Sequence, residues 1–169
     1  MIAIRNILVA TDFGAASDNA LRYGRGLAAR FGARLHVLHV TRSISLTAAI
    51  YGHAGVPFAA REEIERGERA RTEALLTDED RRALRAFATT VTDDSPALAV
   101  VKYARRHHID LLVLGTHGRG AFAHLLLGSV AERVVRTAPC PVLTVRDAEH
   151  EFVAPEPVSA DAPTAPAGL

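Results

Sequence analysis

The sequence predicts an α/β fold, in which helices cover both faces of a single open sheet of five parallel strands. Two observations support this prediction. Short apolar runs alternate along the chain with longer segments in which apolar residues recur every three or four positions, which is typical of strands alternating with amphipathic helices. The short runs are apolar throughout, which indicates strands buried on both faces of a parallel sheet.

The first half of the chain begins with a strand, a helix and a second strand. The run Arg5–Ala10 predicts a buried strand, and helical spacing follows over Ala16–Phe31, with Gly32 placed to end the helix. Leu35–Val40 completes a β-α-β unit, whose crossover is almost always right-handed. The stretch Thr41–Ala60 is irregular and contains glycine and proline, so we expect a loop there.

The second half continues the alternation of helices and strands. Arg61–Arg82 is rich in Glu, Arg and Ala and predicts one helix, and Leu84–Val91 predicts a strand. The turn Asp93–Pro96 combines acidic and hydroxyl caps with proline, which signals a helix that runs to about His107. The last three elements are expected to be a strand over Asp110–Leu114, a helix over Ser129–Thr137 and a strand over Pro141–Val145.

Composition narrows the class of protein. A chain of 169 residues fits one domain, expected over residues 1–146, followed by an Ala- and Pro-rich tail over 147–169 that we expect to be disordered. The formal net charge of +1 argues against a protein that grips nucleic acid through its phosphates. No apolar run approaches the roughly 20 residues that span a bilayer. The single cysteine, Cys140, allows no internal disulfide and suits a cytoplasmic location.

The segment Gly115–Ser129 carries the clearest functional signal, with the pattern G-x2-G-x9-G-S. Glycines at 115 and 118 let backbone amides approach a phosphate without obstruction by side chains. Gly128 and Ser129 open a helix, whose first N–H groups are unpaired and whose dipole favours an anion. Parallel sheets bind ligands beyond the carboxyl ends of their strands, where Asp12 and Val40 are also expected to lie. The sequence therefore predicts a phosphate-bearing ligand at this edge.

The chain resembles the ATP-binding subgroup of the universal stress protein family over residues 2–146. The shared stretches are Ile-Leu-Val-Ala-Thr-Asp-Phe, Asp-Leu-Leu-Val-Leu-Gly-Thr-His-Gly-Arg-Gly, Leu-Leu-Leu-Gly-Ser-Val-Ala and Ala-Pro-Cys-Pro-Val-Leu-Thr-Val. The resemblance implies a Rossmann-like fold of the adenine nucleotide alpha hydrolase type, with ATP (or AMP or ADP) bound together with Mg²⁺. It also implies homodimers that pair their last strands, here Val142–Val145. The net charge and the lack of a long apolar run predict that neither nucleic acid nor a membrane is a partner.

The resemblance further assigns roles to individual residues. It implies that Asp12 contacts the ribose and Val40 the adenine edge, while the glycine segment holds the phosphates. No catalytic residue and no protein metal site is expected. The residues that the resemblance places around the nucleotide are Ala10, Thr11, Asp12, Val40, Leu114, Gly115, His117, Gly118, Arg119, Gly128, Ser129 and Val130.

Several of these signals also have a purely structural or a different functional interpretation. Ser129–Glu132 matches a capping box, in which serine only stabilises the helix start, and Asp12 could simply cap the first helix. Gly118–Ala123 matches the dinucleotide fingerprint G-x-G-x-x-A, although that fingerprint belongs after a first strand, not a fourth. His36 and His39 are three residues apart in a strand, so we expect them to point to opposite faces.

Three functions are therefore considered. The first is an ATP-binding regulatory protein of the stress response, whose nucleotide state changes its stability or its partner contacts. The second is a slow ATPase or self-phosphorylating protein. Fast phosphoryl transfer needs a positioned base and concentrated positive charge, for which the sequence offers only Asp12, His117 and Arg119. The third is a dimeric interaction module without nucleotide, in which the glycines serve only the turn.

Overall fold

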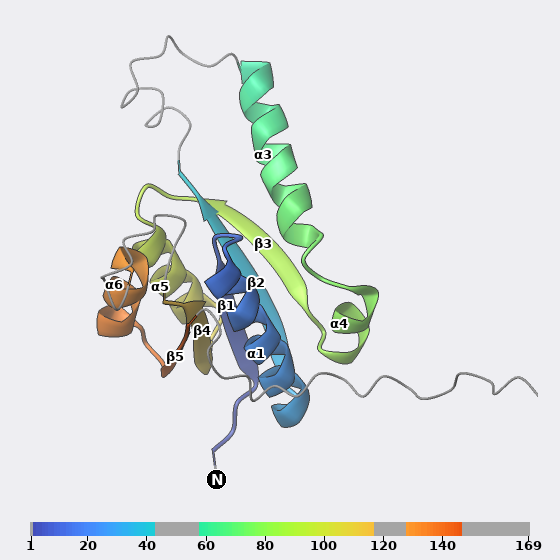
Figure 1. Ribbon diagram of the computed structural model, residues 1–169, viewed down its shortest axis with the longest axis vertical. Coiled ribbons are helices and arrows are strands. Elements are labelled where there is room, and N and C mark those ends of the chain that lie inside the picture. The colour runs from blue at the N-terminus through green and yellow to red at the C-terminus, as the bar shows by residue number, and fades with distance from the viewer. Residues whose placement is uncertain (1, 43–57, 117–127, 147–169) are drawn as a thin grey trace, which may run out of the picture.

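The computed structural model describes residues 2–42, 58–116 and 128–146 (Figure 1), and within them the predicted α/β architecture is confirmed. Five parallel strands form one sheet in the order β3-β2-β1-β4-β5. The strands are β1 Asn6–Thr11, β2 Arg34–Thr41, β3 Phe87–Thr92, β4 Leu111–Gly115 and β5 Val142–Val145.

Helices within the described ranges cover both faces of this sheet. Their bounds are α1 Ala15–Phe31, α3 Phe58–Glu73, α4 Asp78–Ala83, α5 Pro96–Arg106 and α6 Ser129–Thr137. The first core lies between the sheet and α1, and the segment after α3 also contributes to it. The second core lies between the opposite face and the helices α5 and α6. None of the helices in the described ranges has the length and hydropathy that a bilayer span requires.

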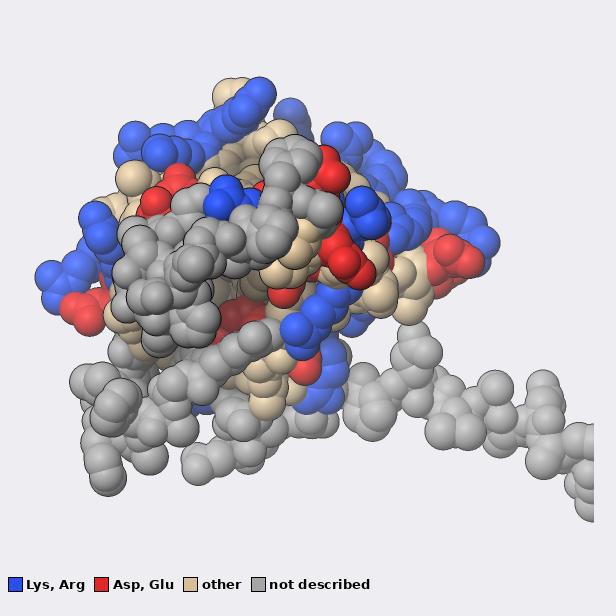
Figure 2. All heavy atoms as spheres, turned by 90° about the horizontal axis from the view of Figure 1, so that it is seen from above, with Lys and Arg blue, Asp and Glu red and all other residues tan. Residues whose placement is uncertain are grey.

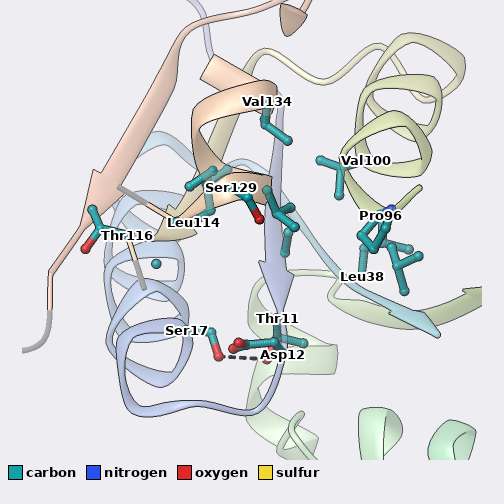
Figure 3. A pocket seen from close by; sticks show the side chains of 16 residues that line it. Thr11, Asp12, Ser17, Leu38, Pro96, Val100, Leu114, Thr116, Ser129 and Val134 are labelled. Atoms are coloured by element: carbon teal, nitrogen blue, oxygen red, sulfur yellow. Dashed lines mark hydrogen bonds between the residues drawn. The ribbon is translucent and has the colours of Figure 1, made fainter. Parts of the chain in front are cut away.

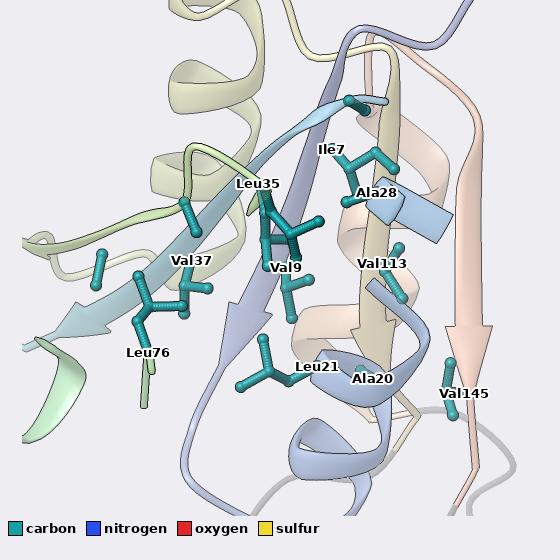
Figure 4. Packing of buried hydrophobic residues seen from close by; sticks show 14 residues of the cluster. Ile7, Val9, Ala20, Leu21, Ala28, Leu35, Val37, Leu76, Val113 and Val145 are labelled. Carbon is teal, nitrogen blue, oxygen red and sulfur yellow. The ribbon is translucent and has the colours of Figure 1, made fainter. Parts of the chain in front are cut away.

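Successive residues of the central strand alternate between these two cores. Ile7 and Val9 face the core under α1 (Figure 4), whereas Leu8 faces the core under α5 and α6. All three side chains are 0% exposed, and burial of each such side chain contributes about 1.5–3 kcal/mol to folding. Because both faces are covered, the strand is apolar at every central position, which is the pattern that predicted a parallel sheet.

The prediction of a single helix over residues 61–82 is wrong, because the chain forms two helices there, α3 and α4. Thr77 starts the second helix with a capping box. Its hydroxyl accepts a hydrogen bond from the Asp80 amide at 3.1 Å, and the Asp80 carboxylate accepts one from the Thr77 amide at 2.9 Å. Asp80 also pairs with Arg25 of α1 at 2.9 Å. The interruption thus anchors α4 to α1.

Other boundaries differ by a few residues. The third strand begins at Phe87 instead of Leu84, because Leu84 is the C-cap of α4 and Arg85 adopts a left-handed conformation with φ 48°. The expected loop ends earlier than predicted, since α3 begins at Phe58. Gly32 ends α1 in a left-handed conformation with φ 61°, as predicted. The tail over 147–169 lies outside the described residues.

Candidate functional site

A pocket of about 340 Å³ opens at the carboxyl ends of β1 and β4. The chain runs outward from β1 through β2 to β3 and then returns to β4 on the other side of β1, so the strand order reverses at this point. Open parallel sheets place their ligands at such a reversal, and the volume lies within the range of small-molecule sites. Figure 2 views the molecule from this end and shows acidic and basic side chains interspersed around it.

The structure brings nine of the twelve predicted site residues together in this pocket. They are Ala10, Thr11, Asp12, Val40, Leu114, Gly115, Gly128, Ser129 and Val130. They come from the ends of β1, β2 and β4 and from the start of α6, which are far apart in the sequence. His117, Gly118 and Arg119 lie outside the described residues.

A network of hydrogen bonds fixes the turn that presents Asp12, and Figure 3 shows the contact between Thr11 and Ser17 that belongs to it. The Gly14 amide donates to the Asp12 carboxylate at 3.0 Å and lies 3.1 Å from the Ser17 hydroxyl. The Ser17 hydroxyl donates to the Gly14 carbonyl at 2.8 Å and lies 3.1 Å from the Thr11 hydroxyl. Gly14 is the N-cap of α1, so the interpretation of Asp12 as that cap is wrong. Asp12 instead lines the pocket from the preceding turn.

The same turn is held from its outer side by an aromatic and charged cluster. Phe13 has a left-handed backbone with φ 61°, which is rare for a bulky residue, costs free energy and persists only where the surroundings impose it. The His39 ring lies 4.4 Å from the Phe13 ring, and the Arg71 guanidinium lies 3.9 Å above it. His39 Nδ1 lies 2.9 Å from the Thr11 carbonyl oxygen, and its Nε2 lies 3.5 Å from Glu68. The pocket turn is therefore tied to α3.

The two ends of the glycine segment meet beside the last strand. The Gly128 amide donates to the Thr116 carbonyl at 2.6 Å, and the Thr116 amide donates to the Val145 carbonyl at 2.8 Å. Gly115 packs against the start of α1 so closely that a Cβ atom there would lie 2.7 Å from the carbonyl carbon of Ala16. Thr116, at the start of this segment, and Gly128, near its end, therefore lie side by side at the rim of the pocket.

The start of α6 forms a polar end of the pocket. Gly128 is the N-cap and makes no side-chain cap, and Ser129 is the first helical residue. The Glu132 amide donates to the Gly128 carbonyl at 2.9 Å, so Ser129 is not the cap of a capping box and that interpretation is wrong. The first N–H groups of a helix have no partner within the helix, and its dipole favours an anion there. This end of the pocket can hold a phosphate.

The opposite side of the pocket is apolar and includes residues that the sequence did not single out. Figure 3 shows Leu38, Pro96 and Val100 together on one side, with Thr116 on the other. Leu38 precedes Val40 by two positions and so shares its face of β2, a signal that strand alternation offers. The lining residues that were not predicted are Ser17, Leu38, Pro96, Val100, Thr116, Ala131 and Val134.

Few titratable groups line the described part of this pocket. Asp12 is the one carboxylate among the described residues that line it. No group of three His, Cys, Asp or Glu side chains that could hold a metal ion occurs within the described ranges. His36 and His39 lie on opposite faces of β2, as predicted, because His36 contacts Tyr103 of α5 and His39 contacts Glu68 of α3. The described part of the site is thus suited to binding by shape, backbone amides and one carboxylate.

Comparison with known proteins gives a consistent result. A family model described as the universal stress protein family matches residues 3–146. A universal stress protein of Thermus aquaticus is 35% identical over 146 residues, covering 84% of this chain and 98% of the relative. The solved structure of universal stress protein UspA from Lactobacillus plantarum is 26% identical, with a TM-score of 0.64, and covers 86% of this chain and 100% of that one. A universal stress protein solved in complex with cAMP is also 26% identical, with a TM-score of 0.56 and coverage of 87% and 100%.

Proposed function

Because the chain belongs to the universal stress protein family, we propose that its pocket binds ATP, or the related AMP or ADP, as a regulatory ligand. One observation carries this proposal. Asp12, the two ends of the glycine segment and the start of α6 all line one pocket, which lies where the strand order reverses. A relative that is 26% identical was solved with a bound adenine nucleotide, cAMP, which supports the same class of ligand here.

The two sides of the pocket match the two halves of an adenine nucleotide. Leu38, Val40 and Val100 offer the apolar surface that a base requires. The start of α6 offers backbone amides and a favourable dipole for phosphates. Asp12 lies at the polar end of β1, where a carboxylate can accept hydrogen bonds from ribose hydroxyls. A base, a sugar and phosphates can therefore each meet suitable chemistry.

A magnesium ion would fit the same arrangement. Mg²⁺ prefers oxygen ligands and is commonly held by one or two carboxylates together with substrate phosphates. Asp12 is the carboxylate of the pocket that could contribute to such a site. The described lining residues include no Lys or Arg to compensate the charge of the phosphates. When bound with the nucleotide, the ion would neutralise that charge.

We favour regulation over rapid turnover. Phosphoryl transfer needs a positioned base and concentrated positive charge, and among the described lining residues Asp12 alone could serve as a base. His117 and Arg119 lie outside the described residues. Phe13, His39 and Arg71 connect the Asp12 turn to α3. Through these contacts, nucleotide binding at Asp12 would affect the position of a surface helix. On this view the nucleotide state sets stability and partner contacts in the stress response.

Titration calorimetry with ATP and Mg²⁺ tests the proposal, after any nucleotide carried through purification has been removed and identified by mass spectrometry. We expect Ser129→Ala to weaken ATP binding about 10-fold or more, since a hydrogen bond to a charged group is worth about 1.5–3 kcal/mol. Thr137→Ala, at the far end of the same helix, is the matched control and should bind like the wild type. Asp12→Asn keeps an acceptor for the Gly14 amide and isolates the role of the negative charge.

The outcomes separate the three functions. Micromolar binding without turnover above that of the Ser129→Ala variant supports a regulatory ligand. Turnover above that control supports a slow ATPase. A complete lack of binding, with no nucleotide carried through purification, would contradict the proposal and leave a dimeric interaction module.

We also propose that the protein forms a homodimer along β5. In the described structure β5 is an edge of the sheet and pairs on one side only, with β4. An apolar edge strand of this kind is a template for pairing with another chain unless it is covered. A second copy related by a two-fold axis would cover it with the same strand.

A further inference from the structure

A buried histidine lies away from the pocket, between the sheet and the last turn of α5. His36 of β2 is 3% exposed. Its ring centroid lies 4.4 Å from that of Phe87 of β3 and 6.0 Å from that of Tyr103 of α5. It lies 5.8 Å from that of His107, the C-cap of α5. Tyr103 and His107 stack on each other at 4.1 Å. The four rings therefore form one cluster that joins β2 and β3 to the end of α5.

One nitrogen of His36 has no partner in this cluster. Nδ1 lies 3.2 Å from the Tyr103 hydroxyl. Nε2 is buried and makes no hydrogen bond with any described residue. Either neutral tautomer leaves Nε2 without a partner, which is a tolerable cost for a neutral ring. A protonated ring would place an N–H donor and a positive charge in the same apolar surroundings, where both are far more costly.

The described groups that face His36 offer no negative charge to compensate a protonated ring. From α5 it meets His107 and the neutral Tyr103 hydroxyl, and from its own strand it meets Arg34. Phe87 of β3 and Leu8 of β1 complete the apolar side of its surroundings. Arg106 and His108 in turn flank His107. Among the described residues, the charged or chargeable neighbours that act on His36 are thus basic, apart from the tyrosine.

We propose that the His36 cluster is an acid-responsive lock, which holds the end of α5 on the sheet while His36 is neutral and releases it when His36 becomes protonated. The released contacts would be those of the last helical turn, where the His107 amide donates to the Tyr103 carbonyl at 3.0 Å and the Ile109 amide to the Ala104 carbonyl at 3.0 Å. The free-energy cost of a protonated His36 falls when water reaches the ring. Tyr103 and His107 are the groups that must move aside to admit that water.

The lock has a consequence for the pocket, and this consequence rests on the proposed function. The same helix lines the pocket with Pro96 and Val100 at its other end. Since α5 is a helix of eleven residues, loosening its last turn weakens the support of the wall formed by its first turns. Acidification would then lower nucleotide affinity as well as stability.

Linkage fixes the direction of the pH dependence. Burial, with smaller effects of His107 and Arg34, lowers the pKa of His36 from 6.5 to about 4. The unfolded or opened state therefore binds the proton first, so stability is present above the unfolded pKa and is lost as pH falls from about 6.5 towards 4. At pH 5 this residue alone should raise the unfolding equilibrium constant by roughly 30-fold relative to pH 8.

The test compares the full-length wild type with His36→Leu, which fills a similar volume and cannot take a proton. Urea unfolding at pH 8 and pH 5, without nucleotide, should show the unfolding constant of the wild type rising about 10- to 30-fold more than that of the variant. Hydrogen exchange by mass spectrometry, corrected for the intrinsic pH effect, should show faster exchange at residues 103–109 at pH 5 in the wild type only. His108→Asn, an exposed position at the same helix end, is the matched control and should behave like the wild type.

Two results would overturn the proposal. One is an equal pH dependence of unfolding in the wild type and His36→Leu. The other is acid-enhanced exchange at residues 103–109 that persists in the variant. Should His36→Leu fail to fold, the ring titration of His36 in the wild type, followed by NMR, decides: titration near 6.5 without loss of structure contradicts the lock. Because none of these measurements involves nucleotide, their failure is distinct from a failure of ATP binding.

Discussion

At the scale of single residues, Gly115 shows why the pocket tolerates little change. A Cβ atom at this position would lie 2.7 Å from the carbonyl carbon, and 2.9 Å from both the carbonyl oxygen and the Cβ of Ala16. Backbone atoms cannot rotate away as side-chain ends can, so β4 and the start of α1 would have to separate. We expect Gly115→Ala to lower the free energy of unfolding by about 1–3 kcal/mol, as overpacking typically does. Urea unfolding followed by circular dichroism measures this change.

Gly67 is the matched control for that substitution. It lies within α3, and a Cβ atom there would meet nothing within 4 Å. Alanine should therefore gain the helix propensity that glycine lacks and raise the free energy of unfolding by about 0.5–1 kcal/mol. Equal effects of the two substitutions would contradict the packing argument at Gly115.

At the scale of elements, α4 depends on Asp80 for both its start and its attachment. The carboxylate accepts a hydrogen bond from the Thr77 amide and pairs with Arg25, while its own side chain is 8% exposed. We expect Asp80→Ala to cost about 2–4 kcal/mol of stability, because it removes the Asp80 half of the capping box and leaves the partly buried Arg25 guanidinium without its carboxylate partner. Glu79→Ala is the control, since Glu79 is 75% exposed in its pair with Arg82 and should change stability by at most about 0.5 kcal/mol.

The same carboxylate predicts a second, acidic pH dependence. Burial would raise the pKa of Asp80, but hydrogen bonds from Arg25 and the Thr77 amide outweigh it, so the pKa lies below its usual 3.8. The stability that Asp80 contributes is therefore complete above the unfolded pKa and is lost as pH falls through the lower folded value. The difference in unfolding free energy between the wild type and Asp80→Asn should be largest at neutral pH and should begin to shrink as pH falls below about 4. A constant difference between them down to pH 2 would contradict this assignment.

How far the elements were predictable depended on whether their ends carry local signals. The strands of the interior and the stop at Gly32 follow from patterns within a few residues, so they were predicted. The break between α3 and α4 also has a local signal, since Thr77 is followed three residues later by Asp80. This signal was missed because the sequence on both sides of it is rich in charged residues and typical of one continuous helix. The start of β3 depends on the left-handed Arg85, and arginine in that conformation has no sequence signature.

The site divides in the same way. Glycines, Asp12 and Ser129 could be identified because particular backbone chemistry needs them. Ser17, Val100 and Val134 line the pocket from helices, and only the packing of α1, α5 and α6 on the sheet brings them there. Apolar periodicity identifies such residues as buried but does not distinguish a core from the wall of a pocket. For this reason the lining residues at the strand ends and at the start of α6 were expected, whereas those that α1 and α5 contribute to the pocket were not.

At the scale of the whole molecule, β5 is one of the two edge strands of the described sheet, and its free side determines how copies could pair along it. The amides of Leu112 and Thr116 donate to the carbonyls of Pro141 and Val145, so alternate residues of β5 turn their backbone groups towards β4. Strand alternation then leaves the backbone groups of Val142 and Thr144 directed to the open edge. A partner strand would bond to these groups and leave the β4 ladder intact.

This geometry allows the proposed dimer to be broken without breaking the sheet. Thr144→Pro removes an N–H that faces the open edge, where proline is tolerated in edge strands, whereas Thr144→Val keeps that donor and is the control. Light scattering coupled to size exclusion should give the mass of a monomer for Thr144→Pro and that of a dimer for the wild type and Thr144→Val, with circular dichroism confirming that all three are folded. A dimer that survives Thr144→Pro would place the interface elsewhere, and a monomeric wild type would show that β5 stays an uncovered edge. If the monomer still binds ATP as the wild type does, the pocket is complete within one chain, as the lining residues of a single copy indicate.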